Sequence, residues 1–165
     1  REKENIKLAL EYVDEAIKLD PNDAEILLVK IQLLIDERVE KYDEAMQLCE
    51  KGEKMDGGDE IFNFTKGVIY LNTEKYELAL ECLIKDLDND PGDPVTHYNL
   101  ACVHSMLGNK EEAINHLTTS LYIDPEDVDD LADDESFDNI RDSKEFKKLE
   151  KLTLAHDIAG YIVDE

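Results

Sequence analysis

Two stretches of the sequence carry residue types that bind metal ions in other proteins. Residues 86–90 read DLDND and begin like a calcium-binding loop. The sixth position of such a loop needs glycine and the twelfth a bidentate glutamate, but Pro91 and His97 stand there. His97 and His104 lie seven residues apart on one face of a predicted helix, without two further ligands at suitable spacing. We therefore expect no metal site and no cofactor.

Catalytic motifs are equally lacking in the sequence. It contains no GxSxG, no HExxH and no glycine-rich phosphate loop. Pairs of acidic residues are frequent, but 42 of the 165 residues are Asp or Glu, and such a composition produces pairs by chance. We expect a protein that is not an enzyme.

The composition limits the classes of partner. The formal net charge of −24 argues against binding to nucleic acid or to anionic membrane surfaces, and it weakly favours basic partners. No run of about 18 apolar residues is present. Three cysteines without close spacing (Cys49, Cys82 and Cys102) indicate reduced thiols and a cytoplasmic location. Because the chain begins at Arg1 and within a repeat, we expect it to be a fragment of a longer protein.

A helical hairpin is repeated along the chain. Residues 94–127 read as two amphipathic helices separated by Gly108-Asn109 and ended by Pro125. An alanine early in the second helix recurs at intervals of 36, 34 and 34 residues, at Ala9, Ala45, Ala79 and Ala113. A large apolar residue follows each of them four positions later, at Val13, Cys49, Leu83 and Leu117. A small residue lets two helices approach closely, and the large residue fills the space beside them.

This pattern resembles the tetratricopeptide repeat family, whose helix-turn-helix units recur every 34 residues. The resemblance predicts an all-α fold, an α-solenoid of helical hairpins with a C-terminal capping helix. The expected parts are a repeat array over 1–127, divided into a half repeat 2–23 and repeats 24–59, 60–93 and 94–127, then 128–165 as an acidic linker and an amphipathic capping helix. Repeat one carries two extra residues near 37–40, which predicts a longer first helix or a looser turn.

Two features depart from a simple array. Asp86 occupies a position where the family usually has a small residue. We expect it to lie at the edge of the packing, turned to solvent or accepting a backbone hydrogen bond; the alternative is a buried acid with a raised pKa. After Pro125 the period ends, and we expect a short helical turn, a loop, and a final helix that begins at Asp142 or Ser143 and ends near Ile162. This helix either caps the array or lies in its groove.

The resemblance implies that the first helices line a concave groove that binds protein partners. The groove-facing positions carried onto this chain are Leu28, Val29, Gln32, Ile35, Phe64, Thr65, Val68, Leu71, Tyr98, Asn99, Cys102, Ser105 and Met106. The basic residues with which chaperone-binding members clamp a terminal carboxylate have no match at Leu28, Gln32, Val95 or Asn99. We therefore predict an interaction scaffold that holds a peptide or an amphipathic helix, and the negative net charge favours a basic one. The alternatives are a regulatory or targeting domain of a larger enzyme, and a self-association module that forms a homo-oligomer.

Overall fold

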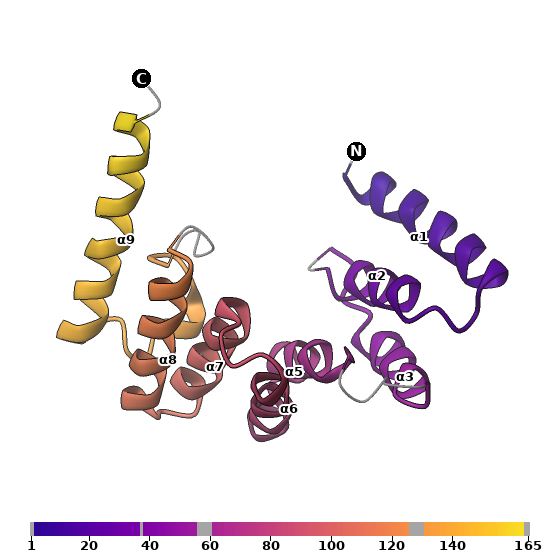
Figure 1. The fold of residues 1–165 in the computed structure, drawn as a ribbon, viewed down its shortest axis with the longest axis horizontal. Helices are drawn as coiled ribbons and strands as arrows, with labels where there is room; N and C mark the ends of the chain where they lie inside the picture. Colours follow the sequence, from indigo (N-terminus) through magenta and orange to yellow (C-terminus); the bar gives the residue numbers. More distant parts are fainter. Residues whose placement is uncertain (1, 37, 56–60, 126–130, 164–165) are drawn as a thin grey trace. The chain divides into compact units, whose positions relative to one another are not determined.

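The part of the chain that the structure describes is entirely helical. The computed structural model describes residues 2–36, 38–55, 61–125 and 131–163, and the side chains of 131–155 within the last range. Helices follow one another as short hairpins, and Figure 1 traces their order along the chain. The fold class is the predicted α-solenoid of helical hairpins. The chain divides into unit 1, Arg1–Lys85, and unit 2, Asp86–Glu165.

Unit 1 contains a helix without a partner from its own hairpin, a complete hairpin and most of a second. The elements are α1 (Glu2–Leu19), α2 (Ala24–Ile35), α3 (Tyr42–Gly52), α5 (Asn63–Asn72) and α6 (Tyr76–Asn89), the last of which continues into unit 2. Asp23 determines where α2 begins, because its carboxylate accepts hydrogen bonds from the backbone N–H groups of Glu25 and Ile26 at 2.9 and 3.1 Å.

Unit 2 contains one complete hairpin followed by a short turn and a long helix. The hairpin consists of α7 (Pro94–Met106) and α8 (Lys110–Ile123), and η1 (Glu135–Phe137) and α9 (Lys144–Val163) follow it. Asp93 caps α7 through the N–H of Thr96, with Pro94 in the first turn, where its missing N–H costs nothing. Ser143 caps α9 by accepting from the N–H of Phe146 at 3.1 Å, which selects between the two predicted caps.

Three of the four recurring alanines are buried, and the fourth, Ala9, is half-buried. Ala45, Ala79 and Ala113 are completely buried, as the repeat pattern predicts. In unit 1 the buried core comprises Leu27, Ile31, Leu34, Ala45, Cys49, Phe62 and Ile69. Gly52 lies against the ring of Phe62, and a Cβ added at Gly67 would come within 2.7 Å of the Leu83 side chain. Small residues in these helices therefore allow large residues of the next helix to pack against the backbone.

The hairpin turns share one backbone feature. Glu40, Glu74 and Gly108 recur at intervals of 34 residues and all have positive φ angles of 51°, 59° and 79°. The two extra residues of repeat one lengthen its turn and not its helix, because α2 ends at Ile35, before the extra residues near 37–40. Asp36 ends α2 and pairs with Arg38 at 2.7 Å. Residues 56–60, where the predicted repeats 24–59 and 60–93 meet, lie outside the described residues.

Candidate interaction site

The repeat period defines one row of side chains on the first helix of each hairpin, which we call the inner row. It consists of Tyr98, Cys102 and Ser105 on α7, and of the residues 34 positions earlier on α5, namely Phe64, Val68 and Leu71. A further 36 positions earlier on α2 it consists of Leu28, Gln32 and Ile35, since repeat one has two extra residues. All nine residues belong to the predicted groove.

The inner row of α7 is covered by the chain itself. The segment 131–141, which includes η1, packs on α7. The hydroxyl of Tyr98 donates a hydrogen bond of 2.5 Å to Oδ2 of Asp134, and the ring of Phe137 meets the ring of Tyr98 edge-on at 5.6 Å between centroids. Cys102 and Ser105 are only 3% and 0% exposed. The third-repeat part of the predicted groove is therefore occupied within the same molecule.

Two further observations show how closely the segment fits. The side-chain amide of Asn139 donates to the backbone carbonyl of Ser105 at 3.2 Å, in the last turn of α7, and this carbonyl also accepts from the backbone N–H of Gly108 at 3.0 Å. Burial raises the pKa of the Tyr98 hydroxyl, and its hydrogen bond to Asp134 raises the pKa further. Burial and the nearby carboxylate of Asp134 also raise the pKa of Cys102. Both groups are thus held in their neutral forms, and Cys102 is no candidate nucleophile.

The inner rows of α2 and α5 differ from that of α7, because they keep exposed surface. Phe64, Val68 and Leu71 are half-buried, and Gln32 is exposed. Val29, beside this row on α2, is 46% exposed although it is apolar. Leu28 and Ile35 are half-buried and contribute partly to the core of unit 1.

The remaining predicted groove residues divide between accessible and inaccessible positions. Thr65 is 7% exposed and offers little surface to a partner. Met106, at the end of α7, is 37% exposed. Asn99 is half-buried and donates to the carbonyl of Val95 in its own helix at 2.9 Å. Of these three positions, only Met106 presents a substantial apolar surface.

The residues first considered for metal chemistry have structural partners. Asp86 is half-buried and accepts a hydrogen bond of 2.7 Å from the hydroxyl of the buried Thr96. His97 and His104 both lie against His116 of α8, whose ring contributes to one cluster with theirs. Among the described residues, no three His, Cys, Asp or Glu side chains converge as a metal ion would require.

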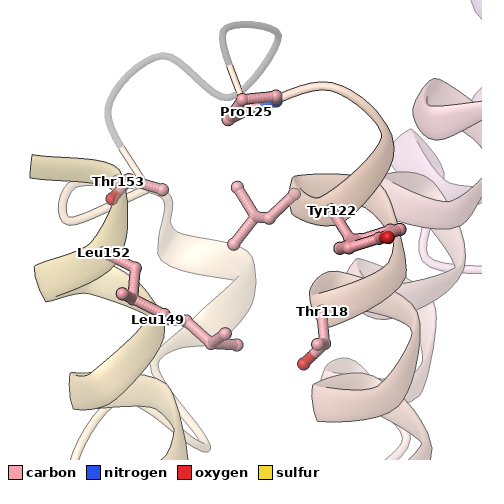
Figure 2. Close-up of a pocket in the computed structure, with 7 residues that line it drawn as sticks. Thr118, Tyr122, Pro125, Leu149, Leu152 and Thr153 are labelled. Atoms are coloured by element: carbon pink, nitrogen blue, oxygen red, sulfur yellow. The ribbon is translucent and has the colours of Figure 1, made fainter. Parts of the chain in front are cut away.

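An apolar notch separates α8 from α9. It has a volume of about 350 Å³ and is lined by Thr118, Leu121, Tyr122, Pro125, Leu149, Leu152 and Thr153. Figure 2 shows Leu149 and Leu152 reaching from α9 toward α8. α9 therefore packs against α8, as a cap would, and it is the segment before α9 that lies on α7.

Comparison with known proteins agrees with this architecture. Family models described as the tetratricopeptide repeat match residues 62–93 and 94–127. Residues 62–127 therefore carry two tetratricopeptide repeats. No curated protein matches the sequence. A tetratricopeptide repeat chain is in general a protein-interaction scaffold, and this chain is one in that broad sense.

Several solved structures share the fold of this chain. The MamA RS-1 ArsTM double mutant is 21% identical with a TM-score of 0.69, covering 94% of this chain and 89% of its own. A crystal structure of MamA is 19% identical with a TM-score of 0.69, covering 98% and 94%. MamA 41-end from Desulfovibrio magneticus RS-1 is 22% identical with a TM-score of 0.68, covering 92% and 88%. At these identities the likeness concerns the fold.

The contacts of Asp134, Phe137 and Asn139 with α7 were not predicted from the sequence. These residues lie in the stretch that the sequence predicts as an acidic linker. Leu131 and Phe137, two apolar residues of this stretch, are buried. Within the described residues, none of the helices has the length and apolar character needed to cross a bilayer.

Proposed function

We propose that the inner rows of α2 and α5 bind a peptide or an amphipathic helix from another protein. The observation that carries the proposal is the difference between equivalent positions in one chain. On α7 the inner row holds a segment of about ten residues by a hydrogen bond and an aromatic contact. On α2 and α5 the corresponding row keeps apolar surface, with Phe64, Val68 and Leu71 only half-buried.

The chemistry of these rows favours an apolar ligand face. Phe64 and Val68 supply aromatic and branched aliphatic surface, and Val29 adds an exposed apolar side chain beside them. An amphipathic helix fits such a surface because its apolar face replaces water along the row. The net charge of −24 favours basic residues on the polar face of the ligand, which would accelerate association at low salt.

A peptide library displayed on phage and selected against the full chain tests this proposal. Selected peptides are then titrated against Val29→Gln and Phe64→Ala, with Ile84→Gln as the matched control. Val29 and Ile84 are apolar residues of unit 1 with nearly equal exposure, 46% and 49%, but Ile84 lies on α6, away from the inner row. We expect about a tenfold or greater loss of affinity for the first two variants and less than about twofold for the control.

The proposal fails if no peptide is selected, or if all three variants bind equally while their circular dichroism spectra remain helical. Sedimentation velocity at two concentrations distinguishes the self-association alternative. If oligomers form as the concentration rises and Val29→Gln abolishes them, the ligand of the inner rows is a second copy of this chain and not another protein.

A further inference from the structure

The segment 131–141 has an internal structure of its own. The guanidinium of Arg141 donates to the carbonyls of Ala132 and Asp134 and pairs with Asp138 at 3.0 Å. The carboxylate of Asp134 also accepts from the N–H of Ser136 at 2.8 Å, which caps η1. These bonds lie within the segment and do not involve α7. The segment therefore presents a preorganised shape to α7, as a short peptide ligand would.

The contacts between the segment and α7 are directional. An acidic side chain at Asp134 accepts from Tyr98, an aromatic ring three residues later at Phe137 meets the same tyrosine edge-on, and an amide at Asn139 donates to the carbonyl of Ser105. The segment thus contacts Tyr98 at two places, its hydroxyl and its ring. A buried hydroxyl requires a partner, so a segment without the acid would leave Tyr98 unsatisfied.

We propose that the inner face of α7 is a recognition site for short segments in which an acidic residue precedes an aromatic residue by three positions, and that residues 131–141 are the copy of this pattern held in cis. A segment of another protein with the same pattern competes for Tyr98 with the chain's own. This inference rests on the proposed function only in treating the inner rows as ligand-binding surfaces, since it concerns α7 and a different ligand class.

The test removes the contacts of the segment 131–141 with α7 in the full chain and then adds the segment as a separate peptide. The altered chain is called the vacated chain. The receptor is the full chain carrying Asp134→Asn and Phe137→Ala, which leaves α7 unchanged. The probe is a fluorescein-labelled synthetic peptide with the sequence of residues 131–141, LADDESFDNIR. Fluorescence polarisation should give a Kd at least about tenfold lower for the vacated chain than for the unaltered chain.

Two controls separate recognition from unspecific adhesion. A peptide carrying the same two substitutions should bind neither chain measurably. Adding Tyr98→Phe to the vacated chain should weaken binding of the original peptide at least about fivefold, because only the hydroxyl is removed. In the vacated chain Cys102 should become accessible to alkylation, located by peptide mass spectrometry, and the peptide should protect it; in the intact chain it is 3% exposed.

The proposal is overturned if the vacated chain remains helical and the peptide binds both chains equally or neither, which would make the segment a permanent part of the cap. Since Phe137 is fully buried and also packs on Phe146, the double variant could unfold. The conservative Asp134→Asn chain is then used, and absence of peptide binding at about 1 mM overturns the proposal equally. Library peptides that bind α2 and α5 should have the same affinity for the vacated chain and for the unaltered chain. Failure of one proposal can therefore be distinguished from failure of the other.

Discussion

The Nδ1 atoms of His97 and His116 lie 2.9 Å apart and share a hydrogen bond between α7 and α8. The Nε2 atom of His97 lies 3.2 Å from the carbonyl oxygen of Pro91, which only accepts, so Nε2 carries the proton and Nδ1 of His97 accepts from His116. His104 stacks on His116 with ring centroids 5.4 Å apart. The bond between the two Nδ1 atoms exists only while one of them carries no proton.

We predict that acid destabilises this hairpin through the histidines. Burial and the neighbouring His97 and His104 lower the pKa of His116 to about 4 from its ordinary 6.5, and burial lowers the pKa of His104, although Glu112 opposes both shifts. Between these pH values the unfolded chain binds more protons than the folded one, so stability is complete above pH 6.5 and is lost as the pH falls toward 4. Because the ring of His116 is half-exposed, we expect the free energy of unfolding to fall by only about 1–2 kcal/mol over this pH range.

The measurement is the free energy of unfolding by urea at intervals from about pH 7 to about pH 5, for the original chain and for His116→Gln. Carboxylates remain mostly ionised over this range, so they contribute little to the difference. The variant should be less stable near pH 7 and should show a flatter dependence on pH. Parallel curves for the two chains would show that the cluster does not titrate with folding.

A methyl group at Gly52 should destabilise unit 1. The added Cβ would overlap the ring of Phe62, which is completely buried and has no space to move into. We expect Gly52→Ala to cost about 1–3 kcal/mol in urea unfolding. Gly92→Ala is the matched control: Gly92 is exposed, and the nearest atom to its added Cβ is Oδ1 of Asp90 at 3.6 Å, so a change within about 0.5 kcal/mol is expected. Equal effects would refute the close approach.

The hairpin turns predict opposite effects for two substitutions at equivalent positions. Glu74 has a φ of 59°, a conformation that L-residues adopt at a cost, so Glu74→Gly should stabilise the chain by about 0.5–1 kcal/mol. Gly108 has a φ of 79° and no atom within 4 Å of an added Cβ, so Gly108→Ala should cost about 1 kcal/mol through backbone strain alone. Thermal unfolding of both variants measures the two shifts, and shifts of the same sign would contradict the prediction.

The helices were predictable because their signals are local. The predicted hairpin over 94–127, with its break at Gly108-Asn109 and its end at Pro125, agrees with α7 and α8, which end at Met106 and Ile123. Gly108 and Pro125 end helices through the conformation of their own backbone. The period of the alanines indicates contacts between neighbouring hairpins. The end of α2 was less certain, since two extra residues fit either a longer helix or a longer turn.

The partners of the inner row were not predictable in the same way. Tyr98 and Asp134 are 36 residues apart, and His97 and His116 are 19 apart, so no local spacing pairs them. Asp134 is one of many acids in its stretch, and nothing in its neighbours distinguishes it from the solvated ones.

The sequence by itself determined an all-helical array of hairpins, since each unit is specified by short-range periodicity and by residues that end helices. Only the tertiary structure decided which part of the inner face stays open. The reason is that the deciding contacts join segments that are distant in the sequence. Burial of Phe137 and the hydrogen bond of the Tyr98 hydroxyl hold the segment 131–141 on α7, while the inner rows of α2 and α5 keep exposed surface.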